Sequence, residues 1–579
     1  MKDTAKDRTV RRMTGAQALV HCLVREGVDV VFAYPGGASL PMQQALSHDP
    51  AIRTILPRHE QGGAFAAEGY GRVTGKVGVC MSTSGPGATN VVTGIADAMI
   101  DSTPVVVIAG QVSNAALGTD AFQETDLIGL TTPITKWAHQ VRRPEDIAEA
   151  VARAAYIAGS GRPGPVVLDL TKDAQVGLAE YVEAHCSFIR SYVPVPNPSE
   201  ELIDKAAAMI DEARRPFIVF GQGITHSGAE EELAAFLEKG DMPAGSTLLG
   251  LSALKSDNPH FLGMVGMHGN LAPNAMTQEC DLLIAVGMRF DDRVTGTVNT
   301  YAKQAKKIHI DIDASEINKN VKVDLGILGD AKEVLARLTE KIKPRMRMGW
   351  KAAADYCKSI ETEKVINPEI NPDSGTIKPG EVISRVAEAC DGKAIVVTDV
   401  GQNQMLAARY SRFCQGRSLL SSGGLGTMGF GLPAAIGAKT AAPDRQVCLF
   451  VGDGGLQMTI QELGTIMQEG TGVKVVLLNN NWLGNVRQWQ QLFFGKRYSA
   501  TRMVNPDFEK IAQAYGIDIV SVEDRKDLAP AIAKMFADDK PFILNVHVEE
   551  EDNVFPMVPP GKSVNEIMLN SKEWFEYGK

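Results

Sequence analysis

Short runs of β-branched residues alternate with segments of helical periodicity along most of this 579-residue chain. Strands that alternate with helices form parallel sheets with helices on both faces. Three such stretches follow one another, so the expected fold class is α/β, with three consecutive parallel-sheet domains. The predicted strands are residues 30–33, 53–56, 77–81, 105–108 and 166–170, then 217–220, 282–286 and 307–312, then 394–398, 447–451, 473–478 and 542–546.

Two irregular stretches separate these domains. The first, at 193–198, reads Val-Pro-Val-Pro-Asn-Pro, and such proline-rich sequence is typical of a linker. The second begins with basic residues near position 343 and continues to about 379, with one helical segment and several prolines and asparagines. We therefore expect domains at 14–185, 198–345 and 377–555, followed by a C-terminal tail at 556–579.

Composition excludes several classes of protein. The chain has 59 basic and 69 acidic side chains, a net charge of −10, whereas a general nucleic-acid binder needs a basic face for phosphates. No apolar run approaches the roughly 18 residues of a membrane helix, and the polar first 13 residues do not resemble a signal peptide. The prediction is a cytoplasmic protein that binds neither nucleic acid nor membrane, although a local basic patch stays open.

Polar side chains follow two neighbouring strands of the third domain. Asp453 comes directly after the strand at 447–451, and Asn480 follows the strand at 473–478. The two lie 27 residues apart, a span that one crossover helix fills, so we expect them to be close in space. Carboxylate, amide and carbonyl oxygens suit Mg²⁺, which also takes phosphate oxygens. The predicted metal ligands are Asp453, Asn480 and Trp482, and Gly454 and Gly455 would let backbone N–H groups approach a diphosphate.

This pair of motifs resembles the signature of thiamine-diphosphate enzymes, and the similarity extends from residue 14 to residue 569. Within that superfamily the chain resembles the acetohydroxyacid synthase (acetolactate synthase) catalytic large subunits. The superfamily signature is broad, and Arg-Phe-Asp-Asp-Arg at 289–293 with Pro-Met-Val-Pro at 556–559 narrows it to this family. Other matching stretches include Tyr-Pro-Gly-Gly-Ala at 34–38, Pro-Arg-His-Glu-Gln at 57–61, and residues 83–90, 118–124, 426–431 and 553–562.

The resemblance implies an activity and an assembly. Pyruvate would be decarboxylated on thiamine diphosphate, and the hydroxyethyl carbanion would condense with a second 2-keto acid. The product would be 2-acetolactate or 2-aceto-2-hydroxybutyrate, for branched-chain amino acid biosynthesis. The three domains would bind the pyrimidine ring, a structural and non-redox FAD, and the Mg²⁺–diphosphate, with active sites at the subunit interfaces of a homodimer or homotetramer. A small regulatory subunit and the preferred acceptor keto acid are left open.

Glu60 is the predicted proton-transfer residue. It opens an apolar, Ala- and Gly-rich helix, so a simple helix-dipole partner is the alternative. The resemblance implies that a protonated carboxyl group here bonds the pyrimidine ring, which requires a desolvated site. It also implies that the remaining catalytic positions, which lie around the reacting carbon and the pocket mouth, are Gly37, Gln123 and Lys172.

Residues 424–429 formally fit the G-x-G-x-x-G pattern of dinucleotide sites. The Ser-Ser-Gly that precedes them is not a clean buried strand, which argues against such a site. The resemblance implies instead that Met428 wedges between the two rings of thiamine diphosphate, the alternative being a core-filling methionine. The implied thiamine-diphosphate contacts are Tyr34, Pro35, Pro86, Asn90, Gln402, Asn403, Gly426 and Met428.

The middle domain resembles the FAD-binding part of the family. An acidic residue just after a strand, such as Asp311, suits ribose or adenine hydrogen bonds. Ordinary α/β turns are the alternative, because related thiamine enzymes keep this domain without a flavin. The implied FAD contacts are Arg162, Gly221, Gly223, Thr247, Leu248, His268, Gly287, Arg289, Asp291, Val294, Asp311 and Asp330.

Four residues form the substrate set that the resemblance implies: Phe122, Met267, Arg293 and Trp489. Arg293 would bind the carboxylate of the second keto acid in a fork, and Trp489 would select its size. For Arg293 and Lys172 an interdomain salt bridge is the alternative. Asn403 and Asn485 depart from the family, which usually has histidine and methionine there. Asn403 can still donate to a diphosphate, whereas Asn485 would alter substrate preference or weaken stabilisation of the intermediate.

Two rival hypotheses remain. One is another thiamine enzyme, such as a pyruvate oxidase or a different carboligase, and an oxidase would reduce its flavin when pyruvate is added. The other is a non-catalytic regulatory or flavin-binding protein, against which the intact set of Glu60, Asp453 and Asn480 argues.

Overall fold

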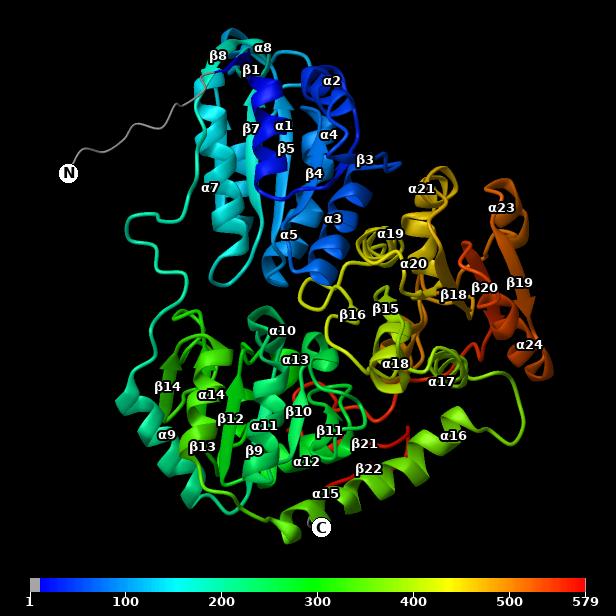
Figure 1. The fold of residues 1–579 in the computed structure, drawn as a ribbon. Coiled ribbons are helices and arrows are strands. Elements are labelled where there is room, and N and C mark those ends of the chain that lie inside the picture. Colours follow the sequence, from blue (N-terminus) through cyan, green and yellow to red (C-terminus); the bar gives the residue numbers. More distant parts are fainter. Residues whose placement is uncertain (1–10, 578–579) are drawn as a thin grey trace. The chain divides into compact units, whose positions relative to one another are not determined.

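Three six-stranded parallel sheets form the framework of the computed structural model, which describes residues 11–577 (Figure 1). The chain is therefore an α/β protein, as its alternating pattern predicts. Contacts divide it into two compact units. The first comprises residues up to Val193 with Gly424–Pro443 and Thr459–Thr471, and the second comprises Pro194–Gly423, Asp444–Met458 and Gly472 onward. Among residues 11–577, no helix is both long and apolar enough to cross a bilayer.

The sheet of the first unit has the order β3-β2-β4-β5-β7-β6. Its strands are β2 (Val30–Ala33), β3 (Arg53–Ile55), β4 (Gly78–Ser82), β5 (Val105–Gln111), β6 (Trp137–Val141) and β7 (Val166–Thr171). The helices are α1 (Gly15–Arg25), α2 (Leu40–His48), α3 (Glu60–Thr74), α4 (Pro86–Asn90), α5 (Val92–Ile100), α6 (Leu127–Thr131), α7 (Ile147–Gly159) and α8 (Lys172–Val176). A short antiparallel pair joins β1 (Arg11–Thr14) to β8 (Leu178–Tyr181).

Alternate side chains of these strands supply two separate cores. On β5, Val106 and Ile108 pack with α1, α2 and α7, while Val105 and Val107 face α3 and α5. A strand directs successive side chains to opposite faces, so a strand covered on both sides is apolar throughout. This explains why the continuous β-branched runs predicted these strands well.

The second unit holds the other two sheets, with orders β11-β10-β9-β12-β13-β14 and β16-β15-β17-β18-β20-β19. The first contains β9 (Pro216–Phe220), β10 (Ala244–Ser246), β11 (Phe261–Met264), β12 (Leu282–Val286), β13 (Lys306–Asp311) and β14 (Leu325–Leu328). The second contains β15 (Ile395–Thr398), β16 (Leu419–Leu420), β17 (Val447–Gly452), β18 (Val473–Asn479), β19 (Asp518–Val522) and β20 (Phe542–His547). A two-stranded pair, β21 (Ile567–Met568) and β22 (Trp574–Phe575), lies near the C-terminus.

Helices cover both faces of the middle sheet and pack on the third sheet as well (Figure 1). Around the middle sheet lie α9 (Glu200–Glu212), α10 (Gly223–Ser227), α11 (Glu230–Gly240), α12 (Leu271–Glu279), α13 (Asp292–Thr295), α14 (Ala331–Lys341) and α15 (Met348–Glu361). The third sheet carries α17 (Pro379–Ala389), α18 (Gln402–Tyr410), α20 (Asp453–Met458), α22 (Gly484–Phe493), α23 (Phe508–Ala514) and α24 (Arg525–Met535). Two helices that follow strands of this sheet, α19 (Gly431–Ala441) and α21 (Leu463–Glu469), belong to the first unit.

Differences from the prediction arise where apolar runs are short or absent. Among the strands of the three parallel sheets, β6, β10, β11, β14, β16 and β19 were not predicted, and β10 reads only Ala-Gly-Ser. The second irregular stretch holds more helix than the single segment expected, since a π-helical turn at Thr362–Ile366 and α16 (Asn367–Ile370) continue α15. Pro368 lacks an N–H group, which favours such a break in the regular hydrogen-bond ladder.

Glycines bring the backbones of α3 and α19 into direct contact. A Cβ atom placed on Gly437 would lie 1.9 Å from the carbonyl oxygen of Ala66, and one on Gly69 would lie 2.1 Å from that of Ala434. Neither helix has room for a methyl group at these positions. Within the first unit, this contact fixes α19 against α3 and so positions the glycine-rich loop that precedes α19.

We predict that Gly437→Ala lowers the free energy of unfolding by about 1–3 kcal/mol, because overpacking forces the two helices apart. Urea denaturation followed by circular dichroism measures the change. Gly159→Ala at the end of α7 is the matched control, since its Cβ would make only an ordinary 3.5 Å contact with Val77. Equal midpoints for the two variants would contradict the prediction.

Candidate active site

The site residues predicted in the first unit gather at one edge of its sheet. Tyr34 and Pro35 follow β2, Pro86 and Asn90 lie in the helix after β4, and Lys172 opens the helix after β7. The strands β2, β4, β5 and β7 are neighbours in the sheet, so their carboxyl ends lie side by side. Ligands of open parallel sheets bind at this edge.

Glu60 begins α3 and is 8% exposed. Asn90 donates its side-chain N–H to the Glu60 carboxylate at 3.0 Å. The other carboxylate oxygen lies close to Gly87, where a Cβ atom would come within 3.1 Å of it. The carboxyl group is therefore buried, held by one amide and bordered by a residue without a side chain. This geometry fits an acid that bonds a cofactor ring as well as a helix-dipole partner.

The predicted catalytic and pocket-mouth residues of this unit lie on nearby loops. Gly37 starts a short 3₁₀ turn after β2, and no atom lies within 4 Å of the position its Cβ would take. Gln123 has a left-handed φ of 62°, and its backbone lies against Gly85. Phe122 is 88% exposed. Open space at Gly37 and an exposed aromatic ring are compatible with a pocket for a small substrate.

The glycine-rich loop 424–429 runs from the third sheet to α19. A buried two-residue strand, β16, does precede it at Leu419–Leu420, so the expectation of no clean strand there holds only in part. Gly426 has a φ of +72° and Met428 is half-buried. The Thr459 hydroxyl group donates a hydrogen bond to the carbonyl oxygen of Gly429 at 2.9 Å, and both residues belong to the first unit.

The predicted metal ligands meet at the carboxyl edge of the third sheet. β17 and β18 are parallel neighbours, and Asp453 accepts the backbone N–H of Asn481 at 2.8 Å. Asp453 is 1% exposed, and burial raises the pKa of its carboxyl group, with hydrogen bonds opposing that rise. Asn480 follows β18 and accepts the N–H of Trp482 through its side-chain oxygen at 3.1 Å. The spacing prediction that Asp453 and the asparagine turn are neighbours is confirmed.

One carboxylate, one side-chain amide and nearby carbonyl groups make this donor set rich in oxygen. Within residues 11–577, no three His, Cys, Asp or Glu side chains gather to hold a metal ion. A site with a single carboxylate fits Mg²⁺, which binds through one or two protein groups and completes its shell with phosphate oxygens and water. It does not fit zinc or iron sites, which are built on histidine or cysteine ligands.

Asn505 was missed by sequence reasoning. Its side-chain N–H₂ donates to Asp453 at 2.6 Å and to the side-chain oxygens of Asn479 at 3.0 Å and Asn481 at 3.1 Å. Gln457 in turn donates to the Asn505 oxygen at 3.0 Å. Asn505 thus forms a hydrogen bond with one carboxylate oxygen of Asp453, the predicted metal ligand, and thereby orients the other oxygen. It lies in a loop 52 residues after Asp453, and no motif marks it.

Asn403 and Gln402 open α18 beside this edge. The Asn403 amide donates to the carbonyls of Asp399 at 2.8 Å and Phe450 at 3.0 Å. Gln402 donates to Gln488 and to the Asp552 carbonyl. An amide has two hydrogens, so donation from Asn403 to a diphosphate requires one of its two bonds to break. Its side-chain oxygen remains as an acceptor.

The predicted FAD residues of the second unit follow strands at the carboxyl edge of the middle sheet. Gly221 follows β9, Thr247 and Leu248 follow β10, Gly287 follows β12 and Asp311 ends β13. The glycines touch one another, since a Cβ on Gly221 would lie 2.4 Å from the Gly287 carbonyl and one on Gly223 would lie 2.5 Å from the Gly287 Cα. Loop packing alone therefore accounts for them.

Two acidic residues of that set cap helices. Asp330 accepts backbone N–H groups at the start of α14, and Asp291 does so at the start of α13. His268 behaves differently, because its buried Nε2 has no hydrogen-bond partner, and burial lowers its pKa to about 4. An orphaned ring nitrogen beside this edge is compatible with a bound ligand. Arg162 lies in the first unit, where it donates to Ser102 at 2.8 Å, so its place in the set stays a prediction.

Met267 and Arg293, both in the predicted substrate set, are brought together. The N–H of Met267 donates to the Arg293 carbonyl at 2.7 Å, and the Arg293 guanidinium lies 3.8 Å from the Met267 sulfur. The Arg293 side chain is 65% exposed, with a weak contact to Asp292 at 3.8 Å. Trp489 packs edge-on against Phe493 in α22. Asn485, in the same helix, has a buried side-chain oxygen without a partner.

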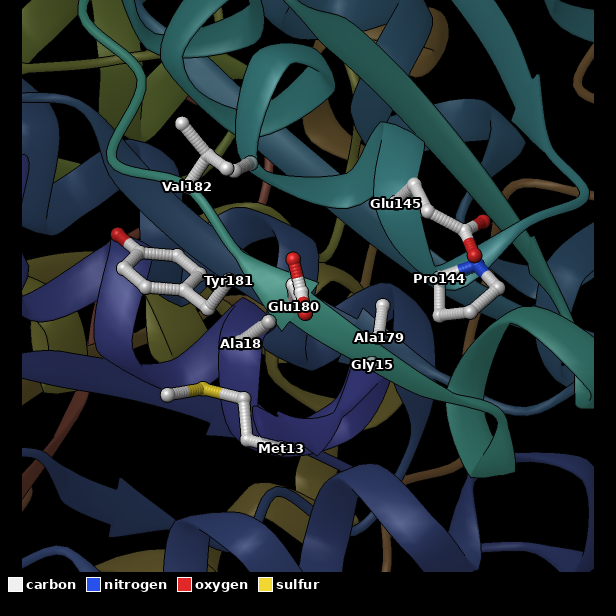
Figure 2. Close-up of a pocket in the computed structure, with 10 residues that line it drawn as sticks. Met13, Gly15, Ala18, Pro144, Glu145, Ala179, Glu180, Tyr181 and Val182 are labelled. Carbon is white, nitrogen blue, oxygen red and sulfur yellow. The ribbon is translucent and has the colours of Figure 1, made fainter. Parts of the chain in front are cut away.

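A small hollow lies beside the antiparallel pair of β1 and β8 (Figure 2). Met13, Pro144 and Tyr181 are among its lining residues. Its volume of about 10 Å³ holds roughly one water molecule. It cannot take a cofactor, so the loops at the sheet edges remain the candidate site.

Comparisons with known proteins agree with this geometry. The N-terminal TPP binding domain, central domain and C-terminal TPP binding domain of thiamine pyrophosphate enzymes match residues 13–130, 203–338 and 399–546. The acetolactate synthase large subunit of Parasynechococcus marenigrum is 47% identical over 95% of this chain and 90% of its own length. The acetolactate synthase large subunit of Lactococcus lactis and the isozyme 2 large subunit of Escherichia coli are each 43% identical over 96% of this chain, and over 96% and 99% of their own lengths.

The chain belongs to the acetolactate synthase large-subunit family. In this chain, the match to the N-terminal TPP binding domain includes Glu60 and Asn90, and the match to the C-terminal TPP binding domain includes Asp453 and Asn480. Thiamine diphosphate is therefore its cofactor. The roles of the individual site residues stay predictions.

We predict that Asn505→Ala weakens divalent-metal binding by about 10- to 100-fold, because a carboxylate ligand loses the partner that orients it. Titration of Mn²⁺ with thiamine diphosphate present, followed by electron paramagnetic resonance, measures the affinity without any turnover. The control is Asn371→Ala, at an exposed position outside the site. Unchanged Mn²⁺ affinity in Asn505→Ala would contradict the orienting role.

Proposed function

We propose that this protein catalyses acetolactate synthesis: it decarboxylates pyruvate and joins the remaining two-carbon unit to a second 2-keto acid. The observation that carries the proposal is the buried Asp453 beside the Asn479–Asn481 turn, in a chain that matches acetolactate synthases over nearly its full length. Bound thiamine diphosphate would supply a thiazolium ring, which serves as the electron acceptor that decarboxylation of a 2-keto acid needs.

The protein's own residues would position the reactants and move one proton. Glu60 would donate a hydrogen bond to the pyrimidine ring, and Asn90 holds its carboxyl group in place. Asp453, Asn480 and the Trp482 carbonyl would bind Mg²⁺, which anchors the diphosphate.

The acceptor would be placed by residues of the second unit. Arg293 has an exposed guanidinium that suits the carboxylate of a 2-keto acid, and Met267 lies against it. Trp489 would limit the size of the acceptor side chain. Gly37 would lie near the reacting carbon, and Phe122, Gln123 and Lys172 would line the mouth of the pocket.

The finer parts of the proposal concern cofactors and assembly. We propose a structural FAD at the carboxyl edge of the middle sheet, near the orphaned nitrogen of His268. A homodimer or homotetramer would place Glu60 of one subunit opposite Asp453 of another, so a monomer would be inactive. The relatives are named large subunits, which supports a small regulatory partner for this chain. The domain bounds 14–185, 198–345 and 377–555 and the cytoplasmic location also stay predictions.

Purified protein with thiamine diphosphate, Mg²⁺ and FAD is predicted to convert pyruvate into acetolactate, and to form 2-aceto-2-hydroxybutyrate when 2-ketobutyrate is added. Product analysis by mass spectrometry decides the question. Bleaching of the flavin on addition of pyruvate, without acetolactate, would indicate an oxidase. No product, with cofactor bound, would overturn the assignment.

Glu60→Gln is predicted to lower the rate of acetolactate formation by about 10²–10⁴-fold, the usual contribution of one proton-transfer group. Glutamine keeps the shape and still accepts from Asn90, so thiamine-diphosphate binding should persist, as fluorescence titration can show. Glu212→Gln, at an exposed position at the end of α9, is the control. Equal rates for both variants would show that Glu60 is only a helix-dipole partner.

A further inference from the structure

Four charged side chains are buried together between α3 and α5 in the first unit. Glu68, Arg72, Asp97 and Asp101 are all at most 6% exposed. Arg72 donates to Asp101 at 2.9 Å and to Glu68 at 3.3 Å. A buried ion pair is weak evidence for stability, because removing two charges from water offsets their attraction. The contacts that the pair makes with its surroundings are therefore more informative.

Asp101 holds the beginning of the glycine-rich loop 424–429. Its Oδ1 accepts the backbone N–H of Gly424 at 2.7 Å, while its Oδ2 accepts from Arg72. A Cβ atom on Gly424 would lie 2.8 Å from the same carboxylate oxygen and 3.0 Å from Ile100. The loop can approach the carboxylate this closely only because residue 424 has no side chain.

Arg72 holds the other end of the loop. Its guanidinium carbon lies 5.3 Å from the centroid of the Phe430 ring, within the range of a cation–π contact. Phe430 is fully buried and packs edge-on against Phe65 at 5.4 Å. The residue before the first turn of α19 is thereby fixed to α3.

Other charged groups lie near the pair of Arg72 and Asp101. Burial, and next the nearby Asp97, raise the pKa of Glu68 well above its usual range. Asp97 is the one charged residue of α5, and Lys439, the one charged residue of α19, donates to the Pro443 carbonyl. Arg72 and Asp101 form an ion pair whose two members contact Phe430 and Gly424, at the two ends of one loop.

We propose that Asp101 and Arg72 are positioning residues that clamp the two ends of loop 424–429 and so fix Met428 for the thiamine diphosphate. The role of Met428 rests on the function proposed above, whereas the clamp itself rests only on the contacts within the first unit. The hydrogen bond from the Gly424 N–H to Asp101 joins residues that are 323 positions apart in the chain.

Hydrogen–deuterium exchange of the cofactor-free protein tests the clamp. Gly424→Ala and Asp101→Ala are expected to speed amide exchange in residues 424–430 by tenfold or more, with the rest of the chain unchanged. Asp101→Asn keeps an oxygen for the Gly424 N–H and is expected to restore part of the protection. The control is Gly349→Ala, where no atom lies within 4 Å of the added methyl group.

Thiamine-diphosphate affinity, measured by tryptophan fluorescence quenching, tests the link to the cofactor. Gly424→Ala is expected to weaken it by about tenfold, while Gly349→Ala leaves it unchanged. Unchanged exchange in the loop, exchange that rises over the whole chain, or faster loop exchange at unchanged affinity would each overturn the proposal. If the natural protein binds no thiamine diphosphate, the proposed function fails while the exchange experiment still decides whether the clamp exists.

Discussion

The parallel pairing of β17 with β18 is the constraint on which the candidate cofactor site depends. Because parallel neighbours end at the same sheet edge, Asp453 and the turn after β18 come together with only one crossover between them. Asn505 then ties one carboxylate oxygen to the side chains of that turn. The protein thus gathers and orients hard oxygen ligands through its own hydrogen bonds, which is what Mg²⁺–diphosphate binding requires.

Sequence alone predicted the strands that carry a continuous run of large apolar residues. The runs in β5, β12 and β17 are continuous and apolar, because these strands bury successive side chains on both faces. The half-buried β6 and the two-residue β16 have no such run, and their pairing depends on neighbouring strands. These strands form because of their contacts with neighbouring strands, which a local sequence pattern does not show.

The candidate site also contains residues that the sequence predicted and residues that it did not. The neighbourhood of Asp453 and Asn480 follows from strand order and a 27-residue spacing, so it could be inferred from sequence. Asn505 could not, because a loop's path decides where its side chain points. The glycines of 424–429 imitate a dinucleotide motif, yet Gly424 is explained by its contact with Asp101 and Gly426 by a left-handed backbone. A glycine pattern such as this one can therefore be explained by the local backbone conformation and packing, without a bound dinucleotide.

Metal stoichiometry tests most directly whether Asp453 anchors a metal–diphosphate complex. Equilibrium dialysis of Mn²⁺ against the natural protein and Asp453→Ala, each with and without thiamine diphosphate, separates the contributions of protein and cofactor. We predict one tightly bound Mn²⁺ per chain when thiamine diphosphate is present, and loss of that ion in Asp453→Ala. Retention of the ion by Asp453→Ala at the same affinity would contradict this assignment of the metal site.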